Sequence, residues 1–94
     1  MERKTFLIKE GYFLYNNIQK IRITIVKQNW DFYFEEGYSD ENPHLNDEGF
    51  AYYVIFNFEN DFEYLSRSST FYSEKEAVNY IEKNYEVIWS WDLG

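Results

Sequence analysis

The residues that come nearest to a metal site lie between Asp40 and Asp47, in the stretch DENPHLND, which includes His44, the only histidine. A calcium-binding EF-hand loop needs glycine at its sixth position and glutamate at its twelfth. Counted from Asp40, those positions hold Leu45 and Tyr52. Zinc would need further histidines, because the chain has no cysteine. We therefore expect no metal and no other cofactor, and a weak calcium site in this stretch is the one alternative left open.

Residues for catalysis are also few. Nucleophilic catalysis would need His44 beside one of the serines between Ser66 and Ser73, and no motif links them. A glycosidase needs two carboxyl groups at a defined separation across a cleft, which a chain of 94 residues has little room to build. The four glycines are isolated and form no phosphate-binding loop. We therefore expect a protein that is not an enzyme.

Acidic residues are concentrated in the middle of the chain. The formal net charge is −8 at pH 7, from 17 acidic and 9 basic residues, and no basic residue lies between Lys27 and Arg67. Ten acidic residues lie in that interval: Asp31, Glu35, Glu36, Asp40, Glu41, Asp47, Glu48, Glu59, Asp61 and Glu63. Carboxylates held together in a folded protein repel one another and destabilise it. A gathered set therefore favours recognition of a basic surface, and acids that only keep loops soluble are the alternative.

The expected spacing of these acids is similar to that of nucleic-acid phosphates. They lie before and after a strand expected at residues 50–58, which at ~3.3 Å per residue spans roughly 30 Å. Ten carboxylates along one side of it would give about one charge per 3 Å, close to the ~3.4 Å phosphate spacing of one DNA strand. Such a surface should bind neither nucleic acid nor an anionic membrane. We expect the basic residues of the N-terminal part, 1–27, to lie away from this acidic surface.

Alternating apolar residues predict the strands. Ile21, Ile23 and Ile25 alternate with polar residues in a strand over 21–26. Further strands are expected at 5–15, 30–35, 50–58, 62–71 and 86–91. The first is interrupted by Lys9–Gly11, which form either a hairpin turn or a bulge. A loop is expected at 37–49, because proline, asparagine, aspartate and glycine favour irregular backbone.

One helix is predicted at residues 74–84. Ser73 is a good N-cap and forms a capping box with the glutamate three residues later, and an apolar stripe runs from Ala77 to Tyr85. One amphipathic helix covers one face of a sheet, and short connections make the sheet mainly antiparallel. We therefore predict a single α+β domain over 1–94, with two layers: a sheet of about five or six strands and this helix on one face.

The composition indicates a soluble protein. No apolar run approaches the ~20 residues of a membrane helix. The first residues, MERKTFLIKEGYFLY, lack the apolar segment and cleavage site of a signal peptide. The absence of cysteine also excludes a disulfide framework. We expect a cytoplasmic location.

These observations predict a non-enzymatic protein-binding inhibitor. Its acidic surface would mimic a nucleic acid and block the basic groove of a nuclease or another nucleic-acid-binding protein, with salt-sensitive association. Phage anti-defence proteins (anti-CRISPR and anti-restriction proteins) and the immunity proteins of nuclease toxins share this general composition. Tyrosines beside the acids would supply contact area. The predicted partner-binding residues are Glu35, Glu36, Tyr38, Asp40, Glu41, Asp47, Glu48, Tyr52, Tyr53, Glu59, Asp61 and Glu63.

An assembly module is the second class of function. The sheet face that the helix leaves uncovered, with tyrosines such as Tyr12 and Tyr53, would pair with a copy of the chain. The edge strand with Trp89 and Trp91 is another candidate for such pairing. In that case the acids only solvate the surface. Both hypotheses allow a monomer or a homodimer.

Overall fold

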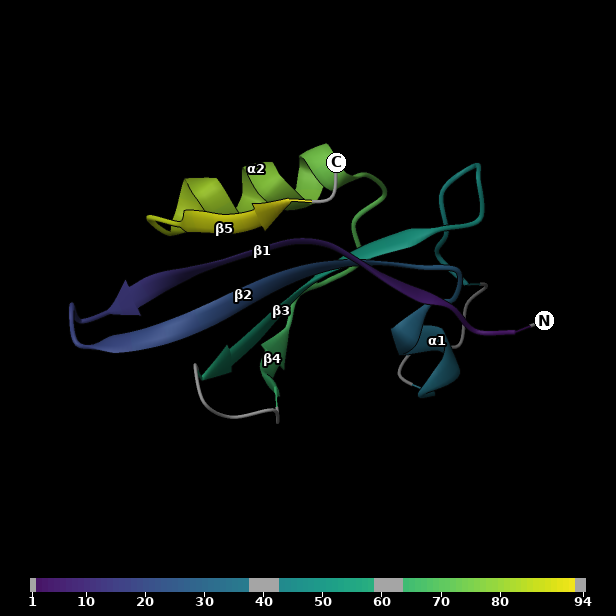
Figure 1. The fold of residues 1–94 in the computed structure, drawn as a ribbon. Coiled ribbons are helices and arrows are strands. Elements are labelled where there is room, and N and C mark those ends of the chain that lie inside the picture. The colour runs from purple at the N-terminus through teal and green to yellow at the C-terminus, as the bar shows by residue number, and fades with distance from the viewer. Residues whose placement is uncertain (1, 38–42, 59–63, 93–94) are drawn as a thin grey trace.

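The computed structural model describes residues 2–37, 43–58 and 64–92, which form a five-stranded sheet with a helix packed on one face (Figure 1). The strands are β1 (Thr5–Tyr15), β2 (Gln19–Gln28), β3 (Ala51–Phe58), β4 (Tyr64–Arg67) and β5 (Ile88–Asp92). The helices are α1 (Phe32–Glu35) and α2 (Glu74–Asn84). The sheet order is β4-β3-β2-β1-β5, and every neighbouring pair is antiparallel. The predicted two-layer α+β architecture is confirmed.

The long hairpin of β1 and β2 dominates the sheet. Its turn uses Asn16 and Asn17, with φ of 53° and 58°, and the Ile18 amide donates to the Tyr15 carbonyl at 3.1 Å. Asparagine tolerates this left-handed conformation better than most residues. At Lys9–Gly11 the strand continues with shifts of register, so the bulge is the correct alternative and the hairpin turn is wrong.

The main core lies between the sheet and α2. Ile21, Ile23 and Ile25 of β2 are 4%, 0% and 0% exposed, and they pack in one cluster with Ala77 and Ile81 of α2. This is the outcome predicted from the alternation, because side chains at every second strand position share one face. Each buried isoleucine contributes about 1.5–3 kcal/mol to folding.

Helix α2 has the bounds that the sequence predicts. The Ser73 hydroxyl accepts a hydrogen bond from the Glu76 amide at 3.1 Å, which caps the first turn. The helix ends where Tyr85 adopts extended backbone. The chain then enters β5, which pairs with β1 at the edge of the sheet opposite β4.

The structure corrects two predicted strands. Residues 30–35 contain α1, because Asp31 is an N-cap whose side chain accepts a hydrogen bond from the Tyr33 amide. The alternation of Trp30, Phe32 and Phe34, which favours a strand, is therefore misleading here. Of the strand expected at 62–71, residues 62 and 63 lie outside the described residues, and in the described part the strand β4 ends at Arg67. Phe71 forms an isolated bridge with Tyr52. No helix in the described part of the chain is long and apolar enough to cross a bilayer.

Candidate functional site

The described acids of the predicted surface lie on two segments, 31–37 and 43–50, which we call the acidic segments. Helix α1, in the first of them, lies on the opposite side of the sheet from α2 (Figure 1). A second apolar cluster underlies the acidic segments: Val26, Ala51 and Tyr53 are its buried members, and Phe32, Tyr33, Leu45 and Ile55 pack against it. The acidic segments therefore cover part of the sheet face that α2 leaves open.

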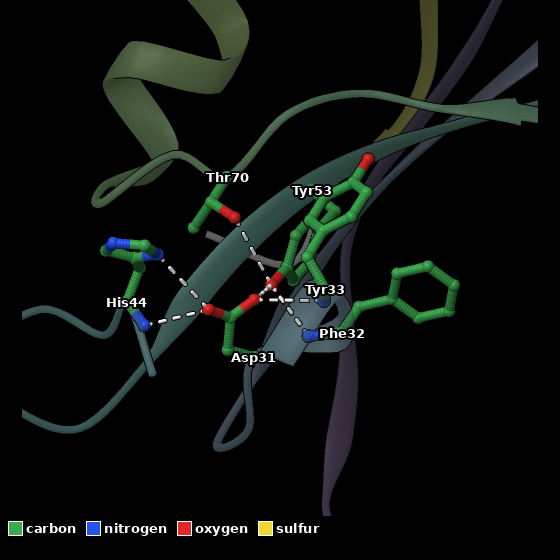
Figure 2. Close-up of polar contacts among 6 residues, drawn as sticks. All are labelled: Asp31, Phe32, Tyr33, His44, Tyr53 and Thr70. Carbon is green, nitrogen blue, oxygen red and sulfur yellow. Dashed lines mark hydrogen bonds and ion pairs between the residues drawn. The ribbon is translucent and has the colours of Figure 1, made fainter. Parts of the chain in front are cut away.

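Asp31 is the centre of the polar contacts that hold the acidic segments (Figure 2). Its side chain is fully buried. Oδ1 accepts hydrogen bonds from the Tyr33 amide and the Tyr53 hydroxyl, both at 3.0 Å. Oδ2 accepts from the His44 amide at 2.8 Å, and the His44 Nδ1 lies 3.5 Å from it. One carboxylate thus joins the first acidic segment, the second one and β3.

Tyr53 completes this network from the sheet. Its hydroxyl donates to Asp31 and accepts from the Phe32 amide at 3.0 Å and from the Thr70 hydroxyl at 3.5 Å. Burial raises the pKa of Tyr53, and the nearby Asp31 charge adds to the rise. The prediction that Tyr53 contacts a partner is wrong, because the residue is 0% exposed. Its position on β3 points it into the second apolar cluster.

Further contacts fix α1 against the rest of the sheet. The Tyr33 hydroxyl donates to the Ser68 carbonyl at 2.6 Å. The Arg67 guanidinium lies over the Phe32 ring, 4.1 Å from its centroid, and donates to the Gln28 side chain at 3.0 Å. Stacking of guanidinium on an aromatic ring and charged hydrogen bonds are each stabilising. Helix α1 is too short to be stable alone, so these contacts hold it in place.

The acidic turn of the second segment is ordered by Asn46. Its side-chain oxygen accepts from the amides of Glu48 and Phe50, both at 2.9 Å, and its side-chain nitrogen donates to the Tyr72 carbonyl at 3.1 Å. Gly49 has a φ of +86°, which glycine adopts at little cost. Asp47 and Glu48 therefore stand at the tip of a turn with defined backbone.

The structure places the described acids unequally. Glu36, Asp47 and Glu48 are exposed, and none makes an ion pair with a described residue. Glu35 is paired with Arg3 at 3.1 Å, and this arginine also lies 4.9 Å from the centre of the Trp30 ring. The expectation that the N-terminal basic residues lie apart from the acids is therefore wrong at this pair.

Two further residues of the predicted surface are not brought together with these acids. Tyr52 is half-buried and belongs to the other sheet face, because neighbouring residues of a strand point to opposite faces. Asp31, counted among the surface acids, is buried. The other predicted site residues lie outside the described residues: Tyr38, Asp40, Glu41, Glu59, Asp61 and Glu63.

The sequence contains signals for the anchoring residues that the predictions from charge and periodicity did not use. An aspartate directly before a short aromatic run is a helix N-cap signal, and it applies to Asp31. Asn46 followed three residues later by Gly49 is a turn signal. Neither signal shows that a carboxylate links two segments, because that contact is between residues far apart in the chain.

Comparisons with protein-family models, with curated proteins and with solved structures find no match for this chain. The chemistry of the site therefore rests on its geometry alone. Among the residues that the structure describes, no three of the His, Cys, Asp and Glu side chains gather as a metal site would require. The Asp31 carboxylate has its oxygens occupied by two backbone amides and a hydroxyl, which is the arrangement of an anchor.

Proposed function

We propose that the protein is a non-enzymatic inhibitor that binds a basic protein through its acidic segments. The partner is a nuclease or another nucleic-acid-binding protein, and the carboxylates occupy the groove that otherwise holds phosphates. Association is driven by complementary charge, so it is fast at low salt and weakens as salt rises. The protein acts in the cytoplasm, where phage anti-defence and immunity proteins meet such partners.

The observation that carries this proposal is the anchoring of the acidic segments by Asp31. Burying a carboxylate costs several kcal/mol unless hydrogen bonds compensate for its lost hydration. The anchor stabilises the fold whether or not these segments bind a partner. A binding surface gains in addition, because a segment already ordered loses less conformational entropy when a partner docks.

The exposed carboxylates support the same proposal. Glu36, Asp47 and Glu48 face solvent without a described ion-pair partner, so their charge is available to a cation on another protein.

Affinity capture tests the proposal. The immobilised protein is incubated with a bacterial lysate at low salt, and bound proteins are eluted with a salt gradient. We expect basic nucleic-acid-binding proteins that elute at modest salt. The double variant Asp47→Lys, Glu48→Lys should lose them, while its circular dichroism spectrum and unfolding midpoint stay close to those of the original.

A matched double variant controls for net charge. Glu74→Lys, Glu76→Lys changes the charge by the same amount at the start of α2, outside the acidic segments. It should retain the captured proteins. Equal loss in both variants would show that only the overall charge matters, and equal retention in both would remove Asp47 and Glu48 from the binding surface.

A further inference from the structure

A small pocket lies between the two acidic segments. It has a volume of about 240 Å³. Glu35 lines it from the first acidic segment, Leu45 from the second, and Trp30 from the chain just before α1. Residues 2 and 3, which pass beside α1 (Figure 1), close another side of it. The pocket therefore belongs to the surface that we propose for a basic partner.

A guanidinium group from the chain itself already lies at this pocket. The Nη2 of Arg3 donates a hydrogen bond to Oε2 of Glu35 at 3.1 Å. The same guanidinium lies over the Trp30 ring, 4.9 Å from its centroid. Tryptophan is the best aromatic partner for a cation, and a planar guanidinium can stack on a ring while its N–H groups reach a carboxylate. Trp30 and Glu35 therefore supply both contacts that an arginine side chain uses.

The contact made by the Arg3 side chain can be exchanged without moving the backbone. The side chains of Arg3 and Glu35 are 54% and 38% exposed, and exposed ion pairs contribute little to stability. The backbone on both sides of Arg3 is held separately by Asn29. The Lys4 amide donates to the Asn29 Oδ1 at 2.7 Å, and the Asn29 Nδ2 donates to the Glu2 carbonyl at 2.9 Å. The guanidinium can therefore leave Glu35 while the backbone stays in place.

The charge of the pocket favours a cation as its occupant. Three carboxylates among the described residues line it, those of Glu2, Asp31 and Glu35, against the single cation of Arg3. The Asp31 oxygens already accept hydrogen bonds from two backbone amides and a hydroxyl. Glu2 and Glu35 are therefore the carboxylates that remain for another molecule. Opposite charges attract, so this lining favours a positively charged group over an anion.

We propose that this pocket binds an arginine side chain of the basic partner, and that Arg3 occupies the contact with Trp30 and Glu35 until the partner docks. This inference rests on the proposed function and names the group that the acidic segments recognise. In the complex the partner's guanidinium stacks on Trp30 and pairs with Glu35, and the Arg3 side chain moves into solvent. Because the incoming group must displace Arg3, its apparent affinity is reduced by the fraction of molecules in which the site is free.

Titration with N-acetyl-arginine amide at constant ionic strength tests the inference, with the indole N–H signals followed by NMR. The Trp30 signal should shift and saturate with a dissociation constant of about 1–10 mM. N-acetyl-lysine amide carries the same charge and should bind at least about threefold more weakly, because an ammonium group does not stack as a plane. Trp89 is the internal control, because its Nε1 donates to Glu82 at 3.0 Å and the residue lies outside the described lining of the pocket. Its signal should not move.

Variants of exposed residues test the role of Arg3. Arg3→Ala should tighten binding of the arginine probe about threefold or more, because the internal competitor is removed. Lys4→Ala changes the net charge equally at a neighbour outside the described lining of the pocket, and it should leave the affinity unchanged. In the Arg3→Ala protein, Glu35→Gln should reverse the gain, whereas Glu36→Gln should preserve it. Circular dichroism should show that all these variants are folded, because each changed side chain is exposed.

The outcomes separate this inference from the proposed function. A Trp30 signal that does not move overturns the inference, even where basic proteins are captured through Asp47 and Glu48. Equal shifts of Trp30 and Trp89 also overturn it, because they would report only the attraction of a cation to a protein of net charge −8. Equal gains from Arg3→Ala and Lys4→Ala would overturn it for the same reason. A probe that binds as expected while no basic protein is captured would support the arginine site and contradict the proposed inhibitor.

Discussion

The hydroxyl of Tyr53 donates a 3.0 Å hydrogen bond to the carboxylate of Asp31, and both side chains are buried. This bond connects β3 to the start of α1. The same carboxylate accepts hydrogen bonds from the backbone amides of Tyr33 and His44, so two segments that are separate in sequence share one anchor. This anchor holds the segments that carry the exposed acids in place.

Asp31→Ala should destabilise the protein strongly. It leaves the Tyr33 amide, the His44 amide and the Tyr53 hydroxyl without their acceptor, and we expect the free energy of unfolding to fall by about 2–4 kcal/mol. Urea denaturation measures the change. Glu36→Ala removes an exposed carboxylate of the same segment and should change the value by less than about 0.5 kcal/mol. Equal values for the two variants would contradict the anchoring role.

Tyr53 should make the protein sensitive to alkali. Its folded pKa lies above the ordinary 10.0, so the folded state keeps the proton after the unfolded state has lost it. The free energy of unfolding is then unaffected by this group below about pH 10 and falls as the pH rises through the folded pKa. Tyr53→Phe should remove this alkaline decrease in the free energy of unfolding. At neutral pH it should lower the free energy of unfolding by about 1–2 kcal/mol, because hydrogen bonds are lost.

Urea unfolding at a series of pH values from about 8 to 11 checks this expectation. Tyr72→Phe is the control, because Tyr72 is 43% exposed and precedes α2. It should preserve the alkaline slope. An alkaline slope that persists unchanged in Tyr53→Phe would mean that another group is responsible.

Gly11 should be essential for docking β5. A Cβ atom at this position would lie 2.6 Å from the Ile88 carbonyl oxygen and 2.9 Å from a ring carbon of Trp89. Gly11→Ala should therefore displace β5 and cost about 1–3 kcal/mol. Hydrogen exchange should accelerate at the amides of β5, because its pairing with β1 is weakened.

Gly37→Ala provides the comparison for that experiment. Nothing lies within 4 Å of a Cβ added at Gly37, but its φ of +79° strains any other residue. It should cost about 1 kcal/mol through backbone strain alone and leave exchange in β5 unchanged. A Gly11→Ala variant as stable as the original, with normal exchange in β5, would show that the strand can adjust.

Local signals in the sequence predicted the elements whose causes are local. Ser73 and the apolar stripe gave α2 its bounds, since capping and helical periodicity act within a few residues. The alternation at Ile21–Ile25 gave β2 and its buried face for the same reason. The general α+β architecture follows from one helix and several hairpin strands.

Contacts between distant residues could not be predicted in this way. Residues 30–35 alternate like a strand, and the N-cap of Asp31 that starts the helix is a local signal, but the contact that fixes this short helix to Tyr53 of β3 is between residues far apart in the chain. Tyr53 was expected on the surface as a tyrosine beside acids, and it is buried because α1 folds over it. The pairing of Arg3 with Glu35 likewise depends on where the N-terminal residues lie in the fold.

The most direct test of the acidic surface is displacement of nucleic acid from a captured partner. A fluorescent DNA duplex bound to that partner has high anisotropy, and adding this protein should lower it to the value of free DNA. Asp47→Lys, Glu48→Lys should lose this effect, whereas Glu74→Lys, Glu76→Lys should keep it. Anisotropy that stays high while the protein demonstrably binds the same partner would contradict the account, because the carboxylates would then not occupy the phosphate site.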